Sequence, residues 1–271
     1  MLKQRIITGL VLGIVVIGTI LVPDTFWVSL LFAAMLFAAT TEMLRLTIKP
    51  PTLASAIAAG AFVLLFWWSL TQVNPLLIYW QALAGLGLWI LITFGLLAYR
   101  HSGHLPLLAR VLLLGLGLDL LWICVHGLIY LHYVYGAEML LYLLSLVWIA
   151  DIGAYFSGRR FGKHKLAPAI SPGKTWEGLC GGLVANLFWI LGIYQLSSGW
   201  GFGLAEFFLI SVATSLISVV GDLFVSVLKR EAGVKDSGKL LPGHGGVLDR
   251  IDSLIAASPV FVAGAFLAGP L

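Results

Sequence analysis

The chain has 271 residues, of which 60% are hydrophobic and only 10% are charged. A water-soluble globule of this size needs more polar surface, so the composition excludes a soluble protein. The formal net charge is +4, which on a membrane protein is first a signal of topology and would also attract anionic lipid and nucleotide phosphates. We expect no nucleic-acid partner.

Apolar stretches of about 20 residues recur along the chain, which is the length that a helix needs to cross the hydrocarbon core of a bilayer. An outer-membrane barrel would instead show short alternating segments. The sequence therefore predicts an all-α, polytopic integral membrane protein with about nine transmembrane helices. They lie near residues 5–22, 26–44, 53–71, 76–98, 106–129, 138–157, 177–196, 204–228 and 252–269.

Two segments leave some choice in this assignment. The basic start and the apolar run at 6–22 are similar to a secretory signal, but Val22-Pro23-Asp24 offers no small-residue cleavage site, so we expect a retained first span. Residues 106–135 fit either one long helix or a span followed by an interfacial turn. We expect five spans in residues 1–135 and a catalytic region of four spans in residues 136–271.

The distribution of Lys and Arg predicts the orientation, because these residues are retained in cytoplasmic loops. With a cytoplasmic N-terminus, all 16 of them fall on the inner side: Lys3, Arg5, Arg45, Lys49, Arg100, Arg110, and the rest in the loops 158–176 and 229–251. The opposite loops contain Asp24, Glu138 and Glu206 but no Lys or Arg. We therefore expect a multi-pass protein of the inner (cytoplasmic) membrane, N-in and C-out, with its active site facing the cytoplasm.

Acidic side chains inside a membrane span are costly and indicate a function in the bundle interior. Three carboxylates are of this kind: Asp119, Asp151 and Asp222. Around Asp222, polar residues recur every three or four positions and form one helical stripe: Ser211, Ser215, Ser218, Ser226 and Lys229. Ser211 and Ser215 are typical of residues that join helices, whereas Asp222 at the cytoplasmic end favours an anion or metal site.

The other two carboxylates differ in their neighbours. Asp151, Tyr155 and Arg159 occupy successive helical turns, with Arg159 about 12 Å along the axis from Asp151. A structural role for Asp151, bonded to a neighbouring helix, competes with a catalytic one. Asp119 has no polar companion at helical spacing, so we expect it to be structural.

The loop from Ser226 to Asp252 is dense in glycine, cations and carboxylates. Glycines let backbone N–H groups approach phosphate oxygens, and Lys or Arg neutralises their charge. Asp222 and Asp249 are suited to Mg²⁺, which usually takes one or two carboxylates plus substrate phosphates. Asp252 fits a metal site and an ordinary helix cap equally well.

The loop at 158–178 contains G-R-R-F-G-K-H-K and S-P-G-K-T-W-E-G. Gly173-Lys174-Thr175 is similar to the end of a P-loop, but Pro168 stands where its first glycine is required and no strand is expected before it. We therefore reject a P-loop and interpret this segment as a basic loop.

Together the two loops resemble the CDP-diglyceride synthetase (phosphatidate cytidylyltransferase) family. The resemblance is carried by S-x-x-K-R-x-x-x-x-K-D at 226–236, H-G-G-x-x-D-R-x-D at 244–252, D-x-x-A-Y-x-x-G-R-x-x-G-K at 151–163 and S-P-x-K-T-W-E-G at 171–178. Gly173 departs from the pattern, since many members have a Lys there. The first 140 residues are similar only in being apolar and polytopic.

The resemblance implies a Mg²⁺-dependent, homodimeric membrane enzyme that joins CTP to phosphatidic acid in phospholipid biosynthesis. It implies catalytic roles for Asp222, Asp249, Lys229 and Arg230, with Asp222 and Asp249 as metal ligands. We expect the substrates to contact Ser226, Lys235, His244, Lys174, Arg159 and Asp151.

Two other classes of function compete with this interpretation. A transporter would also carry buried carboxylates and glycine-interrupted helices, but the chain has no inverted repeat and its polar cluster lies at one face. Another lipid head-group transferase, of the CDP-alcohol phosphotransferase type, would carry a D-G-x-x-A-R pattern, which is absent from the sequence.

Overall fold

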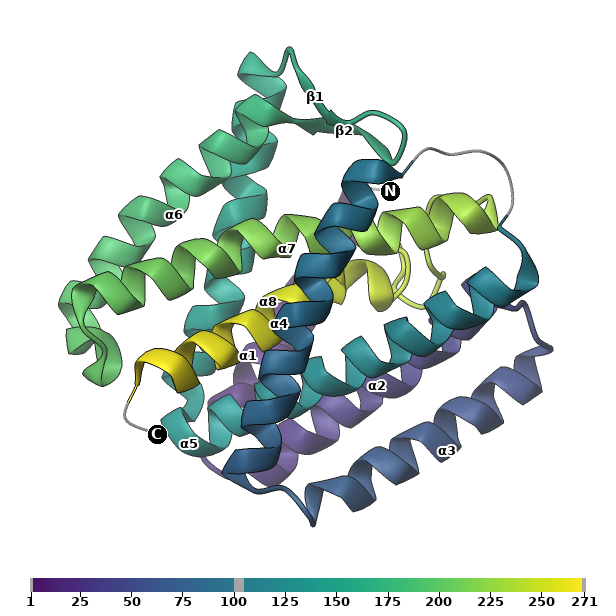
Figure 1. The fold of residues 1–271 in the computed structure, drawn as a ribbon, viewed down its shortest axis with the longest axis horizontal. Helices are drawn as coiled ribbons and strands as arrows, with labels where there is room; N and C mark the ends of the chain where they lie inside the picture. The colour runs from purple at the N-terminus through teal and green to yellow at the C-terminus, as the bar shows by residue number, and fades with distance from the viewer. Residues whose placement is uncertain (1, 100–104, 270–271) are drawn as a thin grey trace.

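The computed structural model describes residues 2–99 and 105–269 and is largely helical (Figure 1). The helices are α1 (Leu2–Ile20), α2 (Thr25–Thr47), α3 (Thr52–Leu70), α4 (Pro75–Ala98), α5 (Leu107–Phe161), α6 (Trp176–Ser197), α7 (Leu204–Ala232) and α8 (Leu248–Ala268). A short 3-10 helix, η1 (Ser198–Gly201), precedes α7. The predicted all-α class is confirmed.

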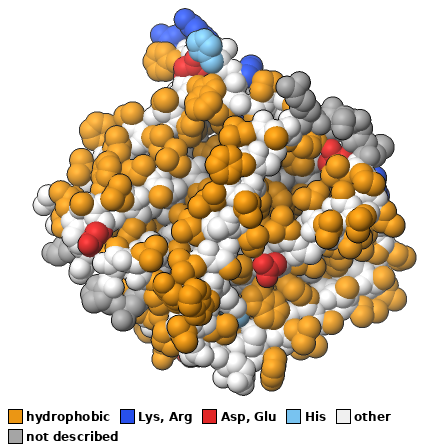
Figure 2. All heavy atoms as spheres, in the orientation of Figure 1, with side chains coloured by type: hydrophobic (Ala, Val, Ile, Leu, Met, Phe, Trp, Pro, Cys, Tyr) orange, Lys and Arg blue, Asp and Glu red, His pale blue; other side chains and the backbone are white. Residues whose placement is uncertain are grey.

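The surface of the bundle is apolar. Seven of the described helices, α2 to α8, are long and apolar enough to cross a membrane, and α1 contributes a shorter apolar segment, Ile6–Ile20. Figure 2 shows hydrophobic side chains over most of one face, and Leu97 and Leu196 are 79% and 84% exposed. Such a surface requires lipid around it. The chain is therefore a multi-pass membrane protein, whereas the count of nine spans and the N-in orientation stay predictions.

The two spans predicted at 106–129 and 138–157 correspond to the two helical parts of α5, which are separated by a kink. Its first part runs as a helix up to Gly136, where φ is 79° and ψ is −172°. A side chain disfavours this backbone conformation and glycine adopts it readily, so Gly136 permits the kink. The expected division of the chain at 135/136 falls at this kink, and buried residues from both sides pack into one hydrophobic core.

The last helix, α8, is the most enclosed of the spanning helices. It packs against α7, α5 and α4. Gly221 of α7 lets these helices meet closely, because a Cβ atom there would lie 2.5 Å from the backbone oxygen of Asp252 and 2.9 Å from the Cβ of Ala256. This contact brings Asp222 of α7 close to the start of α8.

The loop at 158–176 contains a feature that the sequence did not predict, an antiparallel hairpin of β1 (Lys165–Ala167) and β2 (Ser171–Thr175). These strands are too short to show the alternation of apolar and polar residues that identifies a strand in a sequence. The hairpin is closed at its base by the carboxylate of Glu177, which accepts bonds from the backbone N–H groups of Lys163 and His164 and contacts His164 Nδ1 at 2.6 Å.

The two polar loops lie at the same end of the bundle, as predicted. Arg230 of α7 donates from Nε to the backbone oxygen of Ile170 in the hairpin at 3.1 Å, and Ser237 donates to Glu42 at the end of α2 at 2.7 Å. Figure 2 shows Lys, Arg and His side chains gathered at the hairpin end. Arg100 and the side chains of Lys3 and Arg5, which we used for the orientation, lie outside what the structure describes.

Candidate active site at one end of the bundle

The first element of the site is an ion pair between the hairpin and α7. Lys174 Nζ of β2 lies 2.6 Å from Asp222 Oδ2, and Ser226 donates to Asp222 Oδ1 at 3.2 Å. Both charged side chains remain about a quarter exposed, at 23% and 24%. The predicted residues Asp222, Ser226 and Lys174 therefore come together, and a ligand can reach them.

This ion pair adjoins a cavity of about 430 Å³ between α5, α6, α7 and the hairpin. Its polar side chains include Asp151, Arg159 and Lys174, and its walls are mostly apolar, for example Leu179 and Val219. Asp151 lies within electrostatic range of Lys174 and Asp222. The cavity thus combines cations suited to a phosphate with walls suited to hydrocarbon.

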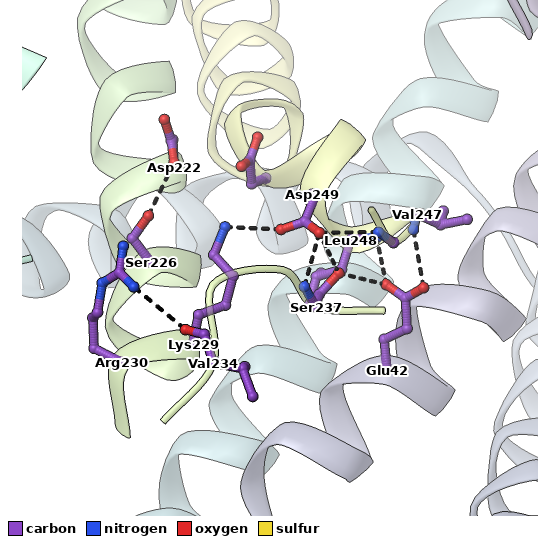
Figure 3. A network of polar contacts seen from close by, with 12 residues as sticks. Glu42, Asp222, Ser226, Lys229, Arg230, Val234, Ser237, Val247, Leu248 and Asp249 are labelled. Carbon is purple, nitrogen blue, oxygen red and sulfur yellow. Dashed lines mark hydrogen bonds and ion pairs between the residues drawn. The ribbon is translucent and has the colours of Figure 1, made fainter. Parts of the chain in front are cut away.

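A second ion pair joins α7 to α8 (Figure 3). Lys229 Nζ lies 2.8 Å from Asp249 Oδ1, and these side chains are only 10% and 5% exposed. Asp249 Oδ2 accepts three further bonds, from the backbone N–H and hydroxyl of Ser237 at 2.8 and 3.0 Å and from Gly246 N–H at 3.0 Å. Lys229 also interacts electrostatically with Asp222 of the first ion pair. The two ion pairs are therefore electrostatically connected through Lys229.

The glycine-rich loop before α8 surrounds a second cavity, of about 640 Å³. It is lined by Lys235, Asp236, Lys239, His244 and Arg250 together with loop glycines. Positive φ angles of 78° at Gly243 and 85° at Gly245 shape this loop. Its cations and accessible backbone are suited to a polyanion.

The two cavities share one charged cluster. Arg250, which lines the loop cavity, lies within electrostatic range of Asp151, which lines the hairpin cavity. Asp252 likewise interacts electrostatically with Asp222, Lys229 and Lys174. The charged groups of the two cavities therefore interact near the ends of α7 and α8.

The structure also bears on Asp252, whose role the sequence left open, and on Arg230, which was predicted to be catalytic. Asp252 does not cap α8, because Val247 is the N-cap and Asp252 lies in the second turn. One of its oxygens accepts from Ser253 N–H at 2.7 Å, and the other has no partner within residues 2–99 and 105–269. Arg230 donates to the backbone oxygens of Ile170 and Val234, so it fixes the hairpin and the following loop.

Glu42 of α2 is a site residue that the sequence analysis missed (Figure 3). It is 6% exposed, and its carboxylate accepts from Ser237 Oγ at 2.7 Å, Val247 N–H at 3.0 Å and Leu248 N–H at 2.9 Å. Glu42 therefore holds the start of α8 and, with Asp249, the loop between α7 and α8. A signal existed, because Glu42 is an acidic residue inside the predicted span at 26–44.

One more connection reaches this end of the bundle from the segment before α5. Glu231, buried at the end of α7, accepts from the Tyr99 hydroxyl at 2.5 Å and from Leu105 N–H at 3.1 Å. Burial and the adjacent Glu231 carboxylate raise the pKa of Tyr99. The end of α7 is thereby tied to the connection between α4 and α5.

The chain was also compared with known proteins by sequence. A model of the cytidylyltransferase family matches residues 3–267. The chain belongs to this family. It is 42% identical over 273 residues to the phosphatidate cytidylyltransferase of Pseudomonas aeruginosa, covering 99% of this chain and 98% of that protein.

Other relatives in the family carry the same name. The phosphatidate cytidylyltransferase of Haemophilus influenzae is 38% identical over 96% of this chain and 97% of its own length. The phosphatidate cytidylyltransferase of Bacillus subtilis is 33% identical over 95% of this chain and 95% of its own length. The family that the two loop motifs predicted is thus confirmed, and with it the class of enzyme, a nucleotidyltransferase.

Proposed function

We propose that this membrane protein joins CTP to phosphatidate, forming CDP-diacylglycerol and pyrophosphate in phospholipid biosynthesis. The observation that carries the proposal is the pair of cavities whose charged side chains interact electrostatically, in a member of this family. Phosphatidate, an anionic head group on a lipid, suits the hairpin cavity with its apolar walls. CTP suits the loop cavity.

In the proposed reaction, a phosphate oxygen of phosphatidate attacks the α-phosphorus of CTP. A new P–O–P bond forms, the bond between the α-phosphorus and the bridging oxygen breaks, and pyrophosphate leaves with the electron pair. Such transfers are catalysed mainly by positioning and by neutralising charge. Lys174 forms an ion pair with Asp222 and Lys229 interacts with it electrostatically, so both cations would offset the charge of the two anions as they approach.

The remaining predicted side chains have separate tasks in this scheme. Arg159 and Asp151 would orient the phosphatidate head group, while Lys235 and His244 would hold the β- and γ-phosphates of CTP. Arg230 would act through the hairpin that carries Lys174, because its bonds go to backbone oxygens.

A divalent cation such as Mg²⁺ fits the donor set at the ends of α7 and α8. Asp222 would be a ligand, as predicted, and Asp252 offers the oxygen that lacks a protein partner. Asp249 was also predicted as a ligand, but its Oδ1 is paired with Lys229 and its Oδ2 accepts three bonds, so it would have to exchange its contact with Lys229 to bind the ion. The described residues contain no group of three or more His, Cys, Asp or Glu side chains arranged for a metal, so the ion would need water and substrate oxygens to complete its ligands. The ion would supply charge neutralisation on the phosphates of CTP.

We further propose that the protein is a homodimer in the inner membrane, with this end of the bundle facing the cytoplasm. The placement of Lys and Arg supports that orientation. CTP would then arrive from the cytosol, and phosphatidate would enter from the surrounding lipid.

The experiment that tests the function mixes the purified protein, in vesicles containing phosphatidate, with CTP labelled in its cytosine ring and with Mg²⁺. We expect a labelled lipid and an equal amount of pyrophosphate. Absence of labelled lipid at saturating substrates would contradict the proposal. A transporter, or an enzyme that consumes CDP-diacylglycerol, would form neither product.

A further inference from the structure

Helix α1 has one side toward lipid and one side toward the bundle. Ile7 and Ile14 are 61% and 70% exposed, whereas Val16 packs against the hydrophobic core and Ile20 is buried in it. Gly9 lies about two helical turns before Val16, on the same side of the helix. Gly9 therefore faces the rest of the protein from the first half of α1.

On this side, Gly9 contacts the loop before α8. A Cβ atom placed at Gly9 would lie 3.5 Å from Nε2 and 3.6 Å from Cε1 of His244, which is ordinary van der Waals contact. The imidazole thus packs against the backbone of α1, with room for a methyl group but not for a longer side chain. At the two other glycines of α1, Gly13 and Gly18, a Cβ atom would meet nothing within 4 Å. The close approach is specific to Gly9.

The backbone of His244 is fixed more firmly than its ring. Gly243 and Gly245 on either side have positive φ angles, and the N–H of His244 donates to the backbone oxygen of Leu241 at 2.9 Å. The ring nitrogen Nδ1 is buried and has no hydrogen-bond partner among the residues that the structure describes. A buried nitrogen without a partner is costly, so the ring depends for its orientation on the groups that pack against it. Gly9 is such a group, next to the other ring nitrogen.

The orientation of this ring matters because His244 lines the loop cavity together with Lys235, Lys239 and Arg250. These three side chains supply cations for a polyanion, and a histidine can donate a hydrogen bond to the same ligand. We infer that Gly9 is a positioning residue of the nucleotide site. Because it has no side chain, α1 can lie against His244 and hold the imidazole at the loop cavity. The first membrane helix thus takes part in CTP binding through His244.

This inference rests on the proposed function and assigns a part of it to α1. The test is Gly9→Leu, whose side chain would displace the His244 ring. We expect Kd and KM for CTP to rise by about tenfold, the loss of one charge-assisted hydrogen bond, while kcat and KM for phosphatidate change little. Equilibrium dialysis with labelled CTP, in the absence of phosphatidate, measures Kd. The formation of CDP-diacylglycerol in vesicles gives the kinetic constants.

Three further variants make the test specific. Gly13→Leu adds the same side chain one turn along α1, where the space is open, and should bind CTP as the unmodified chain does. Gly9→Ala adds only a methyl group, which fits against the ring, and should do the same. His244→Ala should raise Kd for CTP about as much as Gly9→Leu, and combining the two should bring no further change, because both remove the same contact. Thermal unfolding of each variant verifies the fold, and Gly9→Val replaces the leucine variant if that one does not fold.

Two results would overturn the inference. If Gly9→Leu or Gly9→Val binds CTP like the unmodified chain, α1 does not position His244. If the substitution at Gly9 weakens CTP binding equally with and without the His244 ring, its effect does not pass through that ring. The proposed function fails in a different way, because a chain that binds CTP but forms no CDP-diacylglycerol refutes the reaction, while the Kd values still decide the role of Gly9. An unmodified chain that does not bind CTP would refute both.

Discussion

The two ion pairs of the site differ in how firmly they are held. Lys229 and Asp249 are nearly buried, and Asp249 accepts four bonds that tie together α7, α8 and the loop between them. Lys174 and Asp222 are about a quarter exposed and adjoin the hairpin cavity. The difference indicates that the buried pair mainly fixes the geometry of the site, whereas the exposed pair is the more accessible of the two to substrate and metal.

The largest effect is expected from the exposed pair. Asp222→Asn removes the charge that would hold Mg²⁺ but keeps the shape and a bond to Ser226, so turnover should fall by at least about 100-fold with no loss of thermal stability. Rates of CDP-diacylglycerol formation and unfolding curves measure the two effects. Asp119→Asn, also a carboxylate within a span, is the matched control and should stay active. Substantial turnover by Asp222→Asn at saturating Mg²⁺ would remove Asp222 from the metal site.

The buried pair should respond differently. Lys229→Ala leaves the carboxylate of Asp249 buried without its cation, which should cost about 3 kcal/mol of stability and lower turnover by about 30-fold. Lys229→Arg should recover most of the stability. If the alanine variant unfolds like the unmodified protein and only its requirement for CTP changes, Lys229 binds substrate and does not build the site.

A smaller effect is expected from the side chain that supports the buried pair from α2. Glu42→Gln replaces a carboxylate that accepts three bonds by an amide that accepts them less well, and turnover should fall by about tenfold with a smaller change in KM for phosphatidate. Thr41→Val, which alters an exposed neighbour bonded only within its own helix, is the control. Equal kinetics in both variants would show that the loop before α8 keeps its shape without Glu42.

The smallest effect is expected at Gly173, next to Lys174 at the exposed pair. A Cβ atom there would meet nothing within 4 Å, so Gly173→Lys should fold normally and add a cation to the hairpin cavity. We expect KM for one of the anionic substrates to fall by no more than about threefold, since the added charge is exposed. A loss of activity would mean that the hairpin must close further than it does in this structure.

The helices could be predicted from the sequence because each depends on a local run of apolar residues. Residues 76–98 were predicted as a span and Pro75–Ala98 form a helix. Gly136 falls in the break between the spans predicted at 106–129 and 138–157, but the sequence left open whether a turn or one long helix precedes it. The hairpin at 165–175 was missed because its strands are too short.

The site could be predicted only in part, for a related reason. Lys174, Lys229 and Asp249 were named from the loop motifs and Asp222 from the polar stripe of its helix, but their pairing depends on how α7 packs against α8 and the hairpin. Glu42 lies 195 residues before its partner Ser237, and no local pattern connects them. The metal ligands named from the sequence stay a prediction, and the structure decides only that Asp252 is not the cap of α8.

The central claim is that CTP and phosphatidate meet between these two ion pairs, and a structure of the protein with bound CTP in a lipid nanodisc tests it most directly. We expect the triphosphate to lie along the loop at 235–245, with its α-phosphate between Lys174 and Lys229 and with Asp222 close by. A triphosphate bound elsewhere, or at the opposite end of the bundle, would contradict the account.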